Sequence, residues 1–161
     1  MQPPKNSTPT ENICHYCDHF LLPIVQKQNS YIKDTSKNVH RVTELLEACQ
    51  GRMTVFAGYY PWESYLAGAE GYSSVMSNIA PKLSAEMFDK TVDGSGQGRD
   101  LYVQSLPLIN ALAGDLYVSA TKAAMKMIGR SMGDPRPPRL PLPEAKRAEL
   151  EGILRTLGFI A

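Results

Sequence analysis

Between residues 30 and 78 the sequence alternates short segments rich in β-forming residues with segments of helical periodicity. The β-rich segments are SYIKDTS (30–36), RMTVFAG (52–58) and YSSVMSN (72–78), and the predicted helices between them cover residues 38–49 and 61–71. Strands that alternate with helices pair in parallel, because each helix returns the chain to the same end of the sheet. The sequence therefore predicts an α/β fold built on a small parallel sheet.

After residue 80 the pattern changes to apolar residues at helical spacing. Four helices are predicted there, over residues 81–92, 99–113, 118–130 and 143–157. The Gly-rich segment 93–100 is predicted to join two of these helices, and a Pro-rich segment from Asp134 to Pro143 precedes the last one. One more helix is predicted near the N-terminus, over residues 11–28, with a kink at Pro23.

The composition indicates which kinds of binding partner and which cellular compartment to expect. A formal net charge of +1 gives no reason to expect a nucleic acid or a membrane surface as partner. No apolar run approaches the roughly 20 residues of a membrane span, and the polar first residues do not resemble a signal peptide. The cysteines are Cys14, Cys17 and Cys49, an odd and sparse set that favours a reducing compartment. We therefore expect a cytoplasmic protein.

The first predicted strand carries a lysine near its end. Because side chains alternate between the faces of a strand, Tyr31, Lys33 and Thr35 share one face. Two interpretations are open: Lys33 reaches solvent where the strand emerges, or its amine is a nucleophile. Desolvation lowers the pKa of a lysine amine in general, and the neutral amine attacks ketones to form a Schiff base.

Longer motifs bear on this choice. They are YIKDTSKNVHRVTELL (31–46), VFAG (55–58), LAGAEGYSSVMSNIAPKL (66–83), ATKAAMKMIG (120–129) and RLPLPE (139–144). In this order and at this spacing they resemble the dihydrodipicolinate synthase / N-acetylneuraminate lyase family. These are class I, pyruvate-dependent aldolases and their relatives on a (β/α)8 TIM barrel. The resemblance covers residues 31–159.

The resemblance implies a fold and a site. Residues 1–80 would form a partial TIM barrel, strands six to eight of the family, and residues 81–161 a C-terminal helical region of the same domain. Lys33 would form a Schiff base with pyruvate or a related 2-oxo acid, in a carbon–carbon lyase or synthase without metal or other cofactor. Gly58 would end the seventh strand near the pocket. Ser73 is the nearest match to the position that places a backbone carbonyl beside the keto acid.

The sequence also departs from the family. The Gly-Thr-Thr motif that binds the substrate carboxylate and the Tyr-Asn-x-Pro motif with the catalytic tyrosine have no counterpart here, so strands one to five are expected to be missing. The alternative is therefore a truncated, non-catalytic member or a subunit-interaction fragment. Family members associate through their C-terminal helices, so we expect a homo-oligomer or pairing with full-length subunits, and little turnover by the isolated chain.

Other candidate sites were weighed against plainer interpretations. CHYCDH (14–19) has the C-x2-C spacing of a zinc site, but without a second Cys/His pair it is more typical of an amphipathic helix. His40 is either a base for Lys33 or a solvated helix residue beside Arg41 and Glu44. Tyr59, Tyr60 and Trp62 are interpreted as core or subunit-contact residues. PRPPRLPLP (135–143) is either a polyproline ligand or a structural clamp, and Lys122 and Arg139 are interpreted as structural.

Overall fold

The computed structural model describes residues 30–94 and 96–161, in two compact units that divide between Ser73 and Ser74. The predicted helix over residues 11–28 and the CHYCDH motif lie outside the described residues. Within the described part of the chain, no helix combines the length and the apolarity that crossing a membrane requires.

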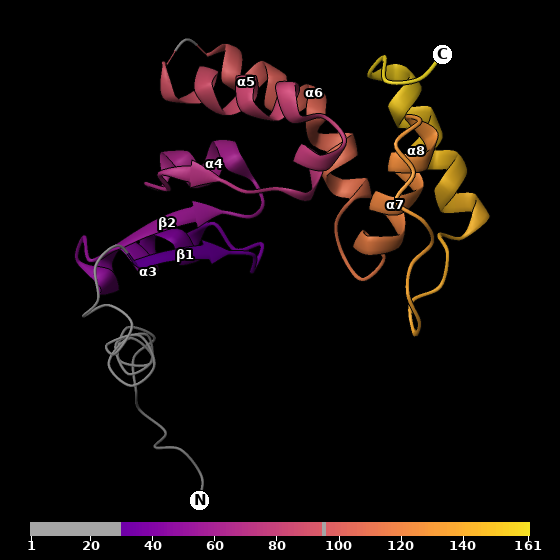
Figure 1. The fold of residues 1–161 in the computed structure, drawn as a ribbon. Helices are drawn as coiled ribbons and strands as arrows, with labels where there is room; N and C mark the ends of the chain where they lie inside the picture. The colour runs from indigo at the N-terminus through magenta and orange to yellow at the C-terminus, as the bar shows by residue number, and fades with distance from the viewer. Residues whose placement is uncertain (1–29, 95) are drawn as a thin grey trace, which may run out of the picture. The chain divides into compact units, whose positions relative to one another are not determined.

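The first unit has the alternating order that the sequence predicts. Its elements are β1 (Ser30–Asp34), α3 (His40–Cys49), β2 (Met53–Ala57), α4 (Pro61–Leu66) and β3 (Gly71–Tyr72). The sheet has the order β1-β2-β3, and both pairs of strands are parallel. The strands β1 and β2 lie side by side in Figure 1. The prediction of an α/β fold with a small parallel sheet is confirmed.

One face of this sheet is covered by helix α3. Along β2 the buried residues alternate with half-buried ones, which is the pattern of a strand with two different faces. Val55 and Ala57 contact Val42 and Leu45 of α3 in one apolar cluster. Burial of an aliphatic side chain of this size contributes about 1.5–3 kcal/mol, so this cluster stabilises the sheet and fixes which face points away from the helix.

All three predicted strands are longer than the observed ones, the second by one residue at each end. The first ends at Asp34 rather than at Ser36, because the Asp34 carboxylate accepts hydrogen bonds from the Ser36 N–H (3.2 Å) and hydroxyl (2.9 Å) and folds the chain into a turn. The prediction of a strand over residues 72–78 is wrong beyond Tyr72. Ser74 accepts a hydrogen bond from the Met76 N–H (3.1 Å) and starts the 3-10 helix η2 (Val75–Asn78).

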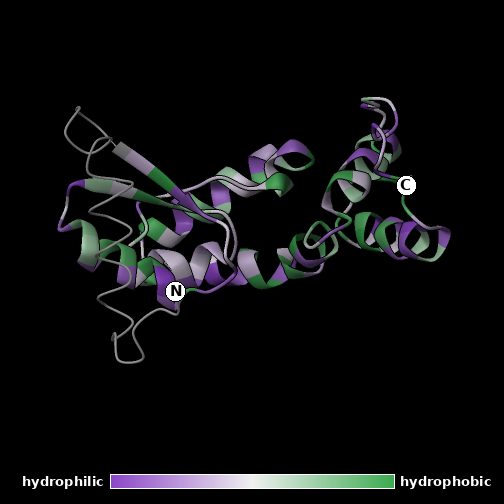
Figure 2. Cartoon of the chain, turned by 90° about the horizontal axis from the view of Figure 1, so that it is seen from below, coloured by the Kyte–Doolittle hydropathy of each residue, from purple (hydrophilic) through white to green (hydrophobic). Residues whose placement is uncertain are grey.

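The second unit is helical, as predicted. After η2 it contains α5 (Pro81–Val92), α6 (Gln97–Ala111), α7 (Tyr117–Met127) and α8 (Glu144–Thr156). Each helix carries hydrophobic and hydrophilic residues together, as the green and purple segments of Figure 2 show. That distribution is typical of helices that bury one side and expose the other.

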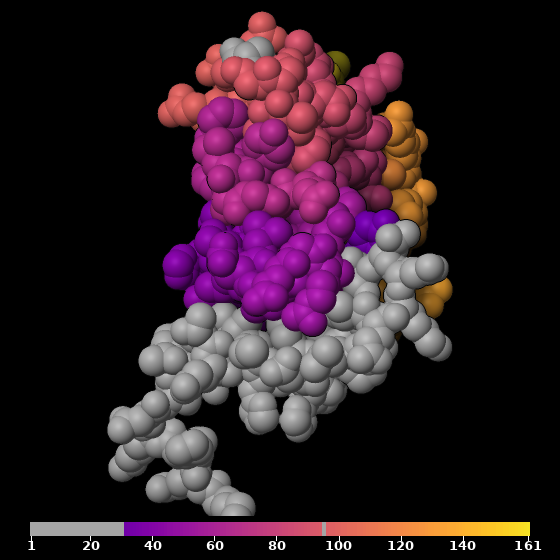
Figure 3. Space-filling model, turned by 90° about the vertical axis from the view of Figure 1, so that its left-hand side faces the viewer, coloured from indigo at the N-terminus to yellow at the C-terminus, as the bar shows by residue number. Residues whose placement is uncertain are grey.

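Helices α5 and α6 lie side by side and are joined at the turn after Val92 (Figure 1). Figure 3 shows the outer surface of the side chains of these helices. The close approach depends on Gly98, because a Cβ there would lie 2.4 Å from the backbone nitrogen of Thr91. The segment that was predicted as a helix–helix linker is therefore part linker and part first turn of α6.

The Pro-rich segment before α8 is tied to α7. The Lys122 amine donates hydrogen bonds to the carbonyls of Met132 (3.0 Å), Gly133 (3.3 Å) and Asp134 (3.1 Å). The Ser119 hydroxyl donates to the carbonyl of Leu140 (2.6 Å). These contacts support the interpretation of this segment as a structural clamp.

Candidate active site

The carboxyl ends of the three parallel strands bring together the residues that the sequence singled out. Lys33 is the penultimate residue of β1, Gly58 directly follows β2, and Ser73 directly follows β3. The Gly58 N–H donates to the Asp34 carbonyl (2.8 Å), and the Ser73 N–H donates to the Ala57 carbonyl (2.8 Å). These bonds continue the ladder of the sheet past the last strand residues. They hold the three positions at one edge of the sheet.

Lys33 and Gly58 approach each other closely. A Cβ at Gly58 would lie 3.0 Å from Cε of Lys33, 2.8 Å from the Asp34 carbonyl oxygen and 2.4 Å from Cγ2 of Thr35. The aliphatic part of the Lys33 side chain therefore passes over the end of β2. Glycine is the residue that leaves room for it.

The sheet face that carries Lys33 is aromatic. In the register of the sheet Lys33 pairs with Phe56, and Phe56 pairs with Gly71, so the three residues share one face. The Phe56 ring lies over Gly71, where a Cβ would be 2.2 Å from Cε1, and is 5.9 Å from the ring of Tyr31. Tyr31 is 60% exposed, and Lys33 is exposed as well. Lys33 thus presents a primary amine beside an aromatic surface that solutes can reach.

No carboxylate among the described residues forms an ion pair with Lys33. The neighbouring acid, Asp34, turns its carboxylate toward Ser36. The Ser36 hydroxyl in turn accepts from the Asn38 N–H (3.2 Å), and the Asn38 side chain accepts from the His40 N–H (3.1 Å). This chain of short-range bonds shapes the loop after β1 and leaves the Lys33 amine free to meet an incoming carbonyl group.

Sequence reasoning missed a contact between the loops after β1 and β2. The Lys37 amine lies 5.1 Å from the centre of the Tyr59 ring, and the Tyr59 ring contacts that of Tyr60 at 6.2 Å. The sequence interpretation of Tyr59 as a core or subunit-contact residue does not include this contact. Parallel pairing predicts that the two loops lie at the same edge of the sheet, but the contact itself depends on the register between β1 and β2.

His40 lies on the first turn of α3, where it faces Glu44 at 3.5 Å and is 77% exposed. This placement matches the interpretation of His40 as a solvated helix residue. Among the residues that the structure describes, no group of three His, Cys, Asp or Glu side chains gathers in a way that could hold a metal ion.

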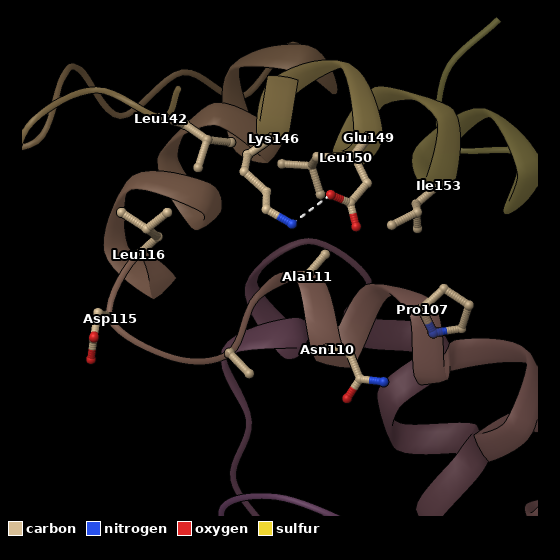
Figure 4. A pocket seen from close by; sticks show the side chains of 11 residues that line it. Pro107, Asn110, Ala111, Asp115, Leu116, Leu142, Lys146, Glu149, Leu150 and Ile153 are labelled. Atoms are coloured by element: carbon tan, nitrogen blue, oxygen red, sulfur yellow. Dashed lines mark hydrogen bonds and ion pairs between the residues drawn. The ribbon is translucent and has the colours of Figure 1, made fainter. Parts of the chain in front are cut away.

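A separate groove of about 580 Å³ lies within the helical unit. Figure 4 shows the apolar part of its lining, which includes Leu116, Leu142 and Leu150, and the ion pair between Lys146 and Glu149 (2.8 Å) at its rim. The two charges of this pair compensate each other. The groove has a mixed lining, with Asn110 and Asp115 beside the leucines, and its lysine amine is paired with Glu149, so Lys33 with its surroundings is the better candidate for chemistry.

Comparison with known proteins identifies similar sequences over most of the chain. The model of the Dihydrodipicolinate synthetase family matches residues 26–157. A 4-hydroxy-tetrahydrodipicolinate synthase of Lachnoclostridium phytofermentans is 31% identical over 134 residues, which are 80% of this chain and 45% of the relative. The protein of the same name from Marinobacter nauticus is 35% identical over 135 residues, with the same two coverages of 80% and 45%. The chain spans about half the length of the curated relatives it matches.

Solved structures show the same likeness. Dihydrodipicolinate synthase from Acinetobacter baumannii, complexed with pyruvate, matches with a TM-score of 0.79 and 28% identity, over 94% of this chain and 50% of that chain. YagE, a prophage protein of the dihydrodipicolinic acid synthase family from E. coli K12, also in complex with pyruvate, matches with a TM-score of 0.70 and 26% identity, over 81% of this chain and 46% of that chain.

Proposed function

Because the chain belongs to the dihydrodipicolinate synthetase family, we propose that it serves a carbon–carbon lyase or synthase reaction in which Lys33 forms a Schiff base with pyruvate or a related 2-oxo acid. The observation that carries this proposal is the position of Lys33. Its amine stands at the carboxyl edge of a parallel sheet, which is the edge where α/β barrels carry their active sites. The pyruvate complexes of the two solved relatives support the choice of ligand.

The chemistry needs a neutral amine. Its lone pair attacks the carbonyl carbon of the 2-oxo acid, the carbonyl oxygen takes up protons and leaves as water, and a protonated imine remains. That imine withdraws electrons from the adjacent methyl carbon. The methyl carbon therefore loses a proton, and the imine becomes an enamine. The enamine carbon then forms the new bond to an aldehyde, and water releases the product and restores the amine. In the lyase direction the same steps run in reverse.

Two further positions have proposed roles in holding the 2-oxo acid. Gly58 leaves space beside the Lys33 side chain, so the imine carbon can lie over the end of β2. Ser73 would contribute its backbone carbonyl rather than its hydroxyl. Ser73 is exposed and its N–H is already bonded to Ala57, so the carbonyl is the group that the sheet does not use at this position.

We also propose that β1, β2 and β3 correspond to strands six to eight of a family barrel, followed by the family's helical extension. The groups that bind the substrate carboxylate and relay protons would then come from a segment outside these three strands. We also propose that the chain associates, either as a homo-oligomer or by pairing with full-length subunits. The sparse cysteines support a cytosolic setting for this chemistry.

A second candidate function is non-catalytic, as a family member that acts through association alone. The observation behind it is the exposure of Tyr31 on the Lys33 face, because association with another segment would bury this ring. The two candidates differ in the reactivity of Lys33.

The test is reductive trapping. The purified chain is incubated with pyruvate, reduced with borohydride and digested, and the adduct is located by peptide mass spectrometry. We expect a single adduct at Lys33, its loss in Lys33→Arg and its retention in Lys82→Arg, which changes an exposed lysine of the helical unit. Labelling scattered over surface lysines, in a sample shown to be folded, would instead support the non-catalytic candidate.

A further inference from the structure

The loops that border Lys33 each contain a residue in an unusual backbone conformation. Lys37, after β1, has φ of 63°, and Tyr60, after β2, has φ of 50°. The left-handed region costs a residue other than glycine roughly 1–2 kcal/mol, and residues held there gather at functional sites. The remaining described residue of this kind, Gln50, closes helix α3, which is an ordinary place for it. Tyr60 also stands at a helix end, as the residue directly before α4, so Lys37 is the one of these described residues whose conformation no helix end explains.

These loops are joined by the contact between Lys37 and Tyr59. The Lys37 amine lies 5.1 Å from the ring centre, a distance at which the ring's negative face attracts a cation. A ring orients the ammonium but does not neutralise it. No carboxylate of the described residues forms an ion pair with Lys37, and both carboxylate oxygens of Asp34 accept bonds from Ser36. The Lys37 amine is therefore held against the Tyr59 ring without a carboxylate partner among the described residues.

The Lys37 amine belongs to the loop that follows β1, the strand that carries Lys33. It contacts the loop that follows the neighbouring strand β2. Tyr59 directly follows Gly58, over which the Lys33 side chain passes. Lys37 is two residues after Thr35. Cγ2 of Thr35 lies 2.4 Å from the position that a Cβ would take at Gly58. The two loops that form the Lys37–Tyr59 contact therefore both begin beside the Lys33 side chain.

We propose that Lys37, oriented by the Tyr59 ring, is a specificity-determining residue that binds a second anionic group of the molecule held at Lys33. The site then favours 2-oxo acids that carry two negative groups over pyruvate, which carries one. A lysine acts on anions as a compact point charge, so a carboxylate and a phosphate both satisfy it. This inference rests on the proposed function of Lys33, and its test includes an arm that does not need Lys33 chemistry.

The first arm measures anion binding directly. Acetic anhydride modifies exposed lysines, and the rate at Lys37 is read by peptide mass spectrometry in the presence of succinate, inorganic phosphate or the neutral analogue succinamide. None of the three can form an imine. We expect succinate to slow acetylation of Lys37 at least twofold while succinamide and the reference residue Lys82 show no change. Slowing by phosphate as well would assign the site to anions in general, and slowing by succinate alone to carboxylates.

Matched variants of the ring test its role. Tyr59→Phe keeps an aromatic face under the ammonium and should keep the protection by succinate, whereas Tyr59→Leu should lose it. Equal protection in both variants would mean that the ring does not orient the cation. Circular dichroism shows in each case that the variant is folded.

The second arm uses borohydride trapping at Lys33 with 2-oxoglutarate and pyruvate in competition. We expect the dianionic acid to be preferred about two- to fivefold, the size of effect that an exposed ion pair gives, and the preference to vanish in Lys37→Met but not in Lys82→Met. An unchanged ratio in Lys37→Met overturns the inference. If neither acid forms an adduct, the proposed function fails, and the acetylation arm still decides for or against an anion site at Lys37.

Discussion

Cε of Lys33 lies 3.0 Å from the position that a Cβ would take at Gly58, across the boundary between two neighbouring parallel strands. This relationship couples the candidate nucleophile to a backbone position on another strand. The space beside the lysine exists because residue 58 has no side chain. The reactivity of Lys33 and the packing at the end of β2 should therefore change together.

Gly58→Ala tests this coupling. The new methyl group meets a backbone oxygen, that of Asp34, as well as Lys33 and Thr35, so the strand ends must move apart. Overpacking of this kind costs about 1–3 kcal/mol. We expect a loss of that size in the free energy of unfolding of the first unit, followed by the fluorescence of Trp62, the single tryptophan. We also expect at least a tenfold drop in the yield of pyruvate adduct at Lys33.

A second substitution separates the clash from other effects of Gly58→Ala. Thr35→Ala removes the closest of the three contacting atoms, Cγ2, from an exposed side chain. In the double variant we expect part of the lost stability to return, whereas Thr35→Ala alone should change stability by less than about 0.5 kcal/mol. Strictly additive effects would show that the methyl group at residue 58 does not meet Thr35.

We expect alanine substitutions at the adjacent residues Ser73 and Ser74 to have different effects on stability. Ser74 caps the 3-10 helix through its hydroxyl, so Ser74→Ala should cost about 0.5–2 kcal/mol of stability. Ser73 is exposed, and its proposed contribution is a backbone carbonyl, which alanine retains. Ser73→Ala should therefore leave both the unfolding free energy and the adduct at Lys33 nearly unchanged. Loss of the adduct in a folded Ser73→Ala protein would assign the role to the hydroxyl instead.

Regular elements were predictable where local signals agree. The helix predicted over residues 81–92 has the same bounds as α5, because Pro81 suits a first helical turn and Gly94 follows its end. The short length of the third strand could not be predicted from the sequence. The residues from Val75 to Asn78 have strand-like composition, but one hydrogen bond from the Met76 N–H to Ser74 commits them to a 3-10 helix.

In the candidate site too, some features follow from the local sequence and others do not. Alternation along residues 30–36 was enough to place Tyr31 and Lys33 on one face, since that rule is local. The approach of Lys33 to Gly58 and the contact of Lys37 with Tyr59 depend on the register between β1 and β2. Register follows from how α3 packs on the sheet, and no single segment of the sequence encodes it.

Two glycines of the helical unit should respond in opposite directions. At Gly98 a methyl group would lie 2.4 Å from the backbone nitrogen of Thr91, so Gly98→Ala must separate α5 from α6 and cost about 1–3 kcal/mol. At Gly152, inside α8, no atom lies within 4 Å of the new Cβ, and alanine should stabilise the helix by about 0.5–1 kcal/mol. Thermal unfolding followed by far-ultraviolet circular dichroism measures both, and destabilisation by Gly152→Ala would contradict this account of α8.

The clamp on the Pro-rich segment gives the last prediction. In Lys122→Met the carbonyls of Met132, Gly133 and Asp134 lose a shared charged donor, and hydrogen bonds to charged groups are worth about 1.5–3 kcal/mol when they are well shielded. Here the contacts are exposed, so we expect a small change in global stability and a larger local one. Hydrogen exchange and cleavage by trypsin should become several-fold faster at residues 130–140, while Lys126→Met, which removes an exposed lysine one turn along α7, leaves both rates as they are. Unchanged rates in Lys122→Met would show that the Ser119 hydroxyl and the prolines hold the segment without the lysine.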